Sequence, residues 1–326
     1  MRRREFAIGA LGAFSAVQWA QAQTNTFALP TQTQQGAVLR GRAPVGSTIQ
    51  IGSLVAPFEA DASGDFIVGL SRSAPQSVTV RCTQSGAALS EVVLTVQQRT
   101  YLTVTITGTG RTAAAGDQQS AIAPNSEFGA FFGDDLFDGG DPELPQDAGE
   151  RAGVVSRTQQ ERETRAARIA REAAAKRAAF ASRLPGTGYR EEFVWPLVGR
   201  ITSQWGAQRI IVPTGGEPRP STPHGGVDIR GITGAAIVAP ASGVVVLADP
   251  DYFYEGGVAF IDHGQGLISA YLHMSAVDVH AGQSIAKGAR IGAVGASGRA
   301  TGPHLCWRMK WRGVDVDPTT LLGMPS

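Results

Sequence analysis

Three short segments near the C-terminus carry side chains that could bind zinc or move protons. His224 stands four residues before Asp228, His273 ends a strand-like run, and His304 stands two residues before Cys306. Imidazole, carboxylate and thiolate are the groups with which proteins hold zinc. On a β-strand, residues i and i+2 point to the same face, so His304 and Cys306 can face one metal ion.

The chain around these residues reads as short strands that would have to position them. Residues 258–262 and 267–271 are β-like and flank the sequence His263-Gly264-Gln265-Gly266, which predicts a tight hairpin. We expect His263 either to have a structural role in this turn or to shape the edge of a groove. His280 lies in a polar loop and receives no role.

Several motifs occur between about residues 192 and 322. They are Arg200-Ile201-Thr202-Ser203-Gln204-Trp205-Gly206, Pro223-His224-Gly225-Gly226-Val227-Asp228, Ala239-Pro240-Ala241-Ser242-Gly243-Val244-Val245, Ile261-Asp262-His263-Gly264, Tyr271-Leu272-His273 and Gly298-Arg299-Ala300-Thr301-Gly302-Pro303-His304-Leu305. In order and approximate spacing, this set resembles the LytM/lysostaphin-type zinc metallopeptidases, which cut peptide bonds in bacterial peptidoglycan. The commonest family pattern ends in His-x-His, whereas this chain has Cys306 at the second position.

The resemblance implies a fold and a role for each site residue. It implies an antiparallel β-sheet peptidase domain with a groove across it and one Zn²⁺ on the groove floor. His224 and Asp228 would be the first two zinc ligands, and Cys306 takes the position of the third. His304 would accept a proton from the attacking water, and His273 would steady the oxyanion.

A thiolate at position 306 is compatible with zinc binding but changes the charge of the site. Neutral His224, ionised Asp228 and thiolate Cys306 would together cancel the charge of Zn²⁺. A second histidine would instead leave a single positive charge. Because a more neutral metal polarises its water less, we expect zinc binding to tolerate Cys306 better than the reaction rate does.

The N-terminal residues 1–22 predict an export signal rather than a folded element. Arg2-Arg3-Arg4 precedes an apolar run at 6–17 and the small-residue cleavage pattern Ala20-Gln21-Ala22. The start resembles a twin-arginine signal, with an ordinary secretory signal as the alternative. Either one predicts a periplasmic or cell-envelope location, and the run is too short to predict a transmembrane segment in the mature chain. The formal charge of +1 gives no case for nucleic acid as a partner.

Composition divides the rest of the chain and predicts a mainly β protein. Short alternating strands at 23–107 predict a small β-sandwich accessory domain. Residues 108–147 read as a Gly/Asp-rich flexible linker, 148–184 as an Ala/Arg/Glu-rich helix, and 190–326 as the LytM-like domain. Because Cys82 and Cys306 fall in different domains, we do not expect a disulfide between them.

The helix at 148–184 has two interpretations. It is either a solvated helix lying on the catalytic domain or a cover for the active-site groove that a partner lifts. Its apolar stripe is weak. The stripe consists of Val155, Ala166, Ile169, Ala173 and Phe180.

These observations predict an exported zinc metalloendopeptidase that hydrolyses the peptide cross-links of peptidoglycan. One alternative is a catalytically weak regulator that binds and activates a cell-wall amidase. The predicted partners are peptidoglycan and either a cell-wall amidase or a divisome or elongation protein. Cys306 and the helix favour this regulator, whereas the retained His273 and His304 speak against it. Another alternative is a peptidase that acts on proteins.

Overall fold

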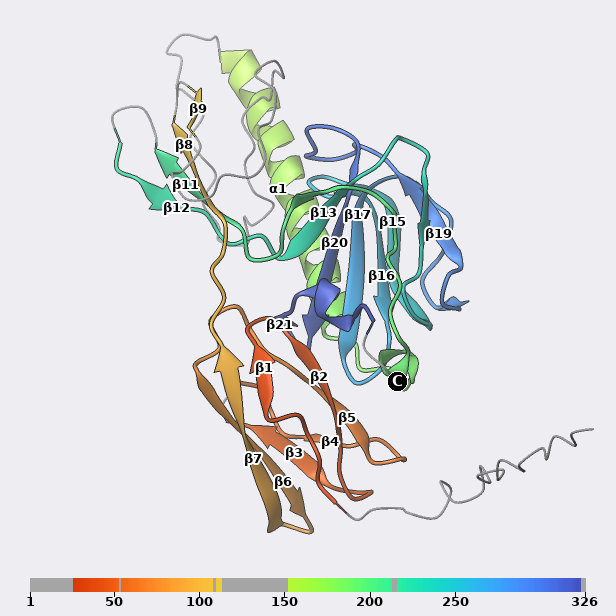
Figure 1. Cartoon of the computed structure of the whole chain (residues 1–326). Coiled ribbons are helices and arrows are strands. Elements are labelled where there is room, and N and C mark those ends of the chain that lie inside the picture. The colour runs from red at the N-terminus through yellow and green to blue at the C-terminus, as the bar shows by residue number, and fades with distance from the viewer. Residues whose placement is uncertain (1–25, 53, 108–109, 113–151, 213–215, 324–326) are drawn as a thin grey trace, which may run out of the picture.

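The computed structural model describes residues 26–52, 54–107, 110–112, 152–212 and 216–323 (Figure 1). The predicted export signal at 1–22 and nearly all of the predicted linker at 108–147 lie outside the described residues. The described part is mainly β, as the sequence predicts. None of the helices described there has both the length and the apolar character needed to cross a membrane.

The N-terminal region is a β-sandwich. A five-stranded sheet in the order β1-β7-β6-β3-β4 and a two-stranded sheet of β2 and β5 share one core, in which Ile49, Phe66 and Leu94 are fully buried. Cys82 is buried in this core, and no disulfide joins it to Cys306, as the sequence predicts. The strands are β1 (Gln32–Gln34), β2 (Val38–Arg42), β3 (Thr48–Ile51), β4 (Phe58–Glu59), β5 (Asp65–Gly69), β6 (Ser77–Gln84) and β7 (Ala87–Gln97).

A small separate sheet joins the end of the predicted sandwich segment to a strand from the later part of the chain. β8 (Thr103–Thr107) falls inside the predicted 23–107 domain but pairs in parallel with β11 (Gln208–Val212). β9 (Gly110–Thr112) and β12 (Arg219–Pro220) complete this sheet in the order β12-β11-β8-β9. A strand pattern predicts the conformation but not the partner, because any exposed strand edge can supply the hydrogen bonds.

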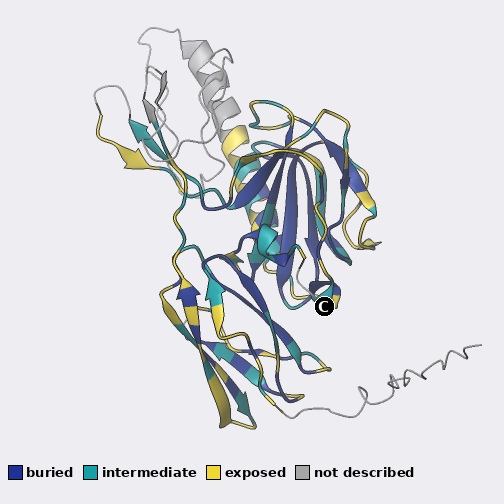
Figure 2. Ribbon diagram, viewed as in Figure 1, coloured by how far each residue is buried: buried dark blue, intermediate teal, exposed yellow. Residues whose placement is uncertain are grey.

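The C-terminal domain is built on one large sheet, in which all the strand pairs are antiparallel. Its central order is β10-β13-β20-β17-β16-β15-β18, with β14 and β19 paired beside β17 and β21 beside β20. Figure 2 shows that the central strands of this sheet are largely buried. The strands are β10 (Ile201–Ser203), β13 (Gly226–Arg230), β14 (Ala236–Val238), β15 (Gly243–Tyr252), β16 (Gly256–Asp262), β17 (Leu267–Val277), β18 (Ser284–Ile285), β19 (Arg290–Val294), β20 (His304–Trp311) and β21 (Val314–Asp315). Short 3-10 helices lie at η2 (Gly188–Arg190) and η3 (Pro318–Leu321).

The two faces of this sheet carry different sets of buried side chains. Along β20, Leu305, Trp307, Met309 and Trp311 are buried in the main hydrophobic core. The alternate residues therefore point to the opposite face, and Cys306 is among them. Trp307 packs in the core, as expected if Cys306 points toward a metal.

The sandwich and the C-terminal domain share the main core. Phe58 meets Trp311 edge to face with ring centroids 5.5 Å apart, and Arg99 pairs with the buried Asp317 at 2.8 Å. Gly36 has a φ of 81°, and a Cβ there would lie 2.5 Å from the Trp205 ring. A side chain at position 36 would therefore force the two domains apart.

His263 belongs to the core side of the β16–β17 hairpin, which forms where the sequence predicts it. Its Nδ1 lies 2.8 Å from the Ser242 carbonyl oxygen and its Nε2 lies 2.7 Å from Ser269 Oγ. Burial lowers the pKa of His263 to about 4, although the Ser242 carbonyl and nearby carboxylates act in the opposite direction. His263 is thus a neutral structural residue at physiological pH.

Candidate metal centre

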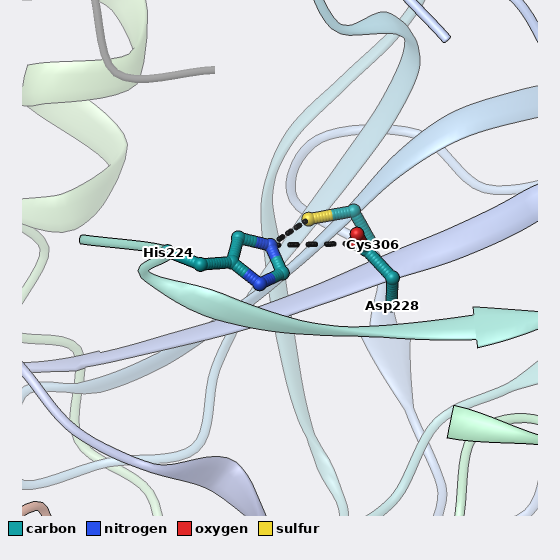
Figure 3. Close-up of side chains that lie close together, drawn as sticks. All are labelled: His224, Asp228 and Cys306. Atoms are coloured by element: carbon teal, nitrogen blue, oxygen red, sulfur yellow. Dashed lines mark hydrogen bonds and ion pairs between the residues drawn. The ribbon is translucent and has the colours of Figure 1, made fainter. Parts of the chain in front are cut away.

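Two neighbouring strands bring the candidate ligands together. β13 and β20 pair antiparallel with Asp228 directly opposite Cys306, so both side chains leave the same face of the sheet. His224 lies in the segment just before β13. Its Nε2 is 3.5 Å from Cys306 Sγ and 3.3 Å from Asp228 Oδ1 (Figure 3).

The spacing of these three donors suits zinc. Their ligand atoms all lie within 4.8 Å of one another. A tetrahedral zinc with bonds of about 2.0 Å to nitrogen, about 2.1 Å to oxygen and about 2.3 Å to sulfur separates nitrogen from sulfur by about 3.5 Å and nitrogen from oxygen by about 3.3 Å. The observed nitrogen–sulfur and nitrogen–oxygen distances match these values. The residues present therefore fit the metal that the sequence predicts.

Asp228 is an ionised carboxylate in a buried position. Burial by itself would raise its pKa, but His224 and His304 beside it outweigh that effect and hold the pKa of Asp228 well below its usual range. Its Oδ1 is buried and makes no well-formed hydrogen bond with any described residue. Burying a carboxylate oxygen without a hydrogen bond costs folding free energy unless a cation contacts that oxygen instead. The position of Oδ1 therefore favours a metal ion here.

Hydrogen-bond partners at Nδ1 set the orientation of all three histidine rings. The Nδ1 atoms of His304 and His273 lie 2.8 Å from the Gly302 oxygen and 2.9 Å from the Ser297 oxygen, respectively. His224 Nδ1 lies 3.1 Å from Ser203 Oγ and 3.4 Å from the carbonyl oxygen of Gln204. A carbonyl can only accept, so the Nδ1 atoms of His273 and His304 carry protons, and the neutral form of either ring has its lone pair on Nε2. Such outer contacts are what fix the tautomer of a metal-binding or catalytic histidine.

His273 reaches the site through a β-bulge. Gly257 pairs with Met274 and Ala259 pairs with Tyr271, so one residue of β16 faces two residues of β17, Leu272 and His273. His273 also has a φ of 66°, in the left-handed region that residues other than glycine seldom adopt. Without the bulge, strict alternation would turn His273 into the core beside Tyr271. Instead its ring centroid lies 4.9 Å from that of His304.

The long helix α1 (Ala152–Phe180) lies on the sheet face that carries Cys306. Ala179 of α1 and Cys306 belong to one buried cluster, which also contains Phe260 and Leu272. The ring of Phe180 meets Phe260 at 4.9 Å. Figure 1 shows α1 running along the sheet on one side of β20, β17 and β16.

Polar contacts fasten α1 to the β15–β16 hairpin. Lys176 forms a buried ion pair with Glu255, and Glu172 accepts a hydrogen bond from the Phe253 backbone N at 2.8 Å. Of the described members of the predicted apolar stripe, Ala166 is exposed, whereas Ile169, Ala173 and Phe180 are half-buried. The stripe misses Glu172 and Lys176, which are buried, because their partners are polar groups distant in sequence.

The strand architecture and the three convergent ligands define a β-sheet domain with a candidate metal centre. Residues 222–318 match the model of Peptidase family M23, so this chain carries a Peptidase family M23 domain. This confirms the resemblance that the motifs predict.

The curated relatives of the domain include both a peptidase and an activator. Peptidoglycan DD-endopeptidase ShyA of Vibrio cholerae is 35% identical over 118 residues, which cover 36% of this chain and 26% of ShyA. Murein hydrolase activator NlpD of Escherichia coli is 30% identical over 128 residues, which cover 39% of this chain and 30% of NlpD. The chain thus spans less than a third of the length of these relatives.

One solved structure resembles nearly the whole chain. It is that of a candidate M23 peptidase from Pseudomonas aeruginosa, which aligns over 89% of this chain and 95% of its own with a TM-score of 0.55 and 24% identity. This likeness extends the shared fold from the M23 domain to the sandwich.

Proposed function

We propose that this protein is an exported zinc metalloendopeptidase that hydrolyses peptide cross-links in bacterial peptidoglycan. One observation carries the proposal: His224, Asp228 and Cys306 converge with zinc spacing on the face where His273 and His304 also lie. Three protein ligands leave a position open for water, which is the arrangement of a catalytic zinc rather than a structural one. The ShyA relative supports peptidoglycan as the substrate class.

The assigned roles follow from the orientation of the rings. When bound, zinc supplies Lewis-acid polarisation of the scissile carbonyl and makes water more acidic. His304 presents an unprotonated Nε2, 3.8 Å from Asp228 Oδ1, and can accept the proton of the attacking water. The imidazolium that results is stabilised by Asp228 and by the Gly302 carbonyl.

His273 acts on the oxyanion under one condition. Since its Nδ1 proton is already donated to Ser297, it can donate from Nε2 only when both ring nitrogens carry protons. A doubly protonated His273 would carry a positive charge beside the negative oxyanion that it stabilises.

The second candidate function is the activation of a cell-wall amidase with little catalysis. Two observations favour it: the similarity to NlpD and the position of α1 over the face that carries Cys306. The convergence of His273 and His304 beside the ligands favours the enzyme, since an activator has no need of these groups.

Replacing Cys306 tests the metal centre. We expect about one zinc per chain in the parent and its loss in Cys306→Ala, because two remaining protein ligands seldom hold zinc. Cys306→His should keep zinc and match or exceed the parent rate at neutral pH, since it restores a net positive cluster. Metal analysis after dialysis against a weak chelator measures the first outcome.

Cys82→Ala is the matched control, because Cys82 is an equally buried free thiol in the sandwich. It should retain zinc like the parent. If Cys306→Ala kept both zinc and activity, Cys306 would not be a ligand and the proposed centre would be wrong.

A further inference from the structure

Arg308 lies next to the unusual ligand of the proposed centre. Its Nε is 3.4 Å from Cys306 Sγ, within reach of a hydrogen bond to sulfur. Arg308 follows Cys306 by two residues on β20, so both side chains leave the same face of the sheet. The same sulfur lies 3.5 Å from His224 Nε2. Arg308 therefore contacts the candidate ligand set through the sulfur of Cys306.

The neighbouring strands leave room for the arginine to lie flat on the sheet. Arg308 pairs with Gly226 on β13 and with Ala270 on β17, two of the smallest residues. A Cβ at Gly226 would lie 2.6 Å from Arg308 Cγ, so a side chain there would push the arginine stem away. The glycine that follows His224-Gly225 thus permits the contact between Arg308 and the sulfur.

We propose that Arg308 is a positioning residue that donates a hydrogen bond to the Cys306 thiolate and offsets its charge. The inference rests on the proposed zinc-peptidase function and deepens it. A thiolate in place of histidine makes the metal cluster formally neutral, and the guanidinium returns one positive charge beside it. A charge-assisted hydrogen bond also withdraws electron density from sulfur. Arg308 therefore allows a cysteine to act as the third zinc ligand, at a position where a neutral histidine is commoner.

The absorption spectrum of the full-length protein with Co²⁺ in place of zinc tests the contact between Arg308 and the Cys306 sulfur. Co²⁺ bound by a thiolate shows a sulfur-to-cobalt charge-transfer band whose energy rises when the sulfur accepts a hydrogen bond. In Arg308→Gln, we expect the band to move to longer wavelength, with Arg308→Lys between this variant and the parent. Turnover on peptidoglycan should fall about 10- to 100-fold in Arg308→Gln with KM unchanged, the usual cost of losing an outer partner of a metal ligand.

Lys310→Gln is the matched control. Lys310 is basic and lies on the same face of β20, but it pairs with Asp315 at 2.8 Å instead of the sulfur. In Lys310→Gln, the sulfur-to-cobalt band should stay at the wavelength of the parent protein. Circular dichroism of each variant confirms that the fold is kept.

The outcomes separate this inference from the proposed function. If the parent shows no thiolate-to-cobalt band, the proposed metal centre itself is wrong. If the parent shows the band and Arg308→Gln leaves its wavelength unchanged, the centre stands and the role of Arg308 is wrong. An increase in KM with an unchanged spectrum would likewise overturn the inference, since Arg308 would then contact substrate.

Discussion

Replacing either His304 or His273 by alanine is expected to reduce peptidoglycan cleavage about a hundredfold or more. Neither residue is assigned as a zinc ligand, so both variants should still bind about one zinc per chain. The physical reason is the loss of the proton acceptor in one case and of the oxyanion donor in the other. Initial rates on purified sacculi, together with metal analysis of the same samples, measure both effects.

His280→Ala provides the control for these variants, because His280 is exposed in a loop and contacts only neighbouring loop residues in the interactions described. It should cleave at the parent rate. A His304 or His273 variant that also cleaved at the parent rate would contradict the role assignment. Loss of zinc from either variant would instead make that histidine a ligand.

Release of α1 is expected to raise activity. Lys176 and Glu255 form a buried pair between α1 and the β15–β16 hairpin, so Lys176→Glu places two like charges in contact and should detach the helix. If the open state is a minor population of about 0.1–10%, full release raises the rate about tenfold or more. Rates on sacculi and limited proteolysis of α1 measure activity and release separately.

The adjacent residue supplies a control with the same change of charge. Arg177 is exposed on α1, so Arg177→Glu should leave both the helix and the rate unchanged. A Lys176→Glu protein whose helix is digested rapidly but whose rate equals the parent rate would remove the idea of inhibition. α1 would then be a spacer that rests on the sheet.

Local patterns were sufficient to predict the elements that hold the candidate ligands. The alternation of β20 predicts that Cys306 and Trp307 face opposite sides, and Trp307 is indeed buried in the core. The glycine-rich turn at 263–266 predicts the β16–β17 hairpin. These features depend on the two-residue period of a strand and on turn chemistry, which are properties of short stretches of sequence.

Other features depend on contacts between distant segments and were not predictable in the same way. Regular alternation would have placed His273 in the core, and only the bulge opposite Val258 turns it outward. The buried face of α1 includes the charged residues Glu172 and Lys176 because the Phe253 backbone N and Glu255 lie beneath it. The contact between Arg308 and Cys306 had one sign in the sequence: Arg308 follows Cys306 by two residues on the same strand.

The central claim is that the zinc-loaded protein cuts peptide cross-links, and analysis of the products released from purified sacculi tests it most directly. The parent and Lys176→Glu proteins are incubated with sacculi, with the Cys306→Ala protein as the metal-free control. We expect cross-linked peptides to be converted to monomers by the zinc-loaded proteins and to remain intact with Cys306→Ala. Intact cross-links with both zinc-loaded proteins, together with faster amidase cleavage when either is added, would contradict the peptidase and establish the activator.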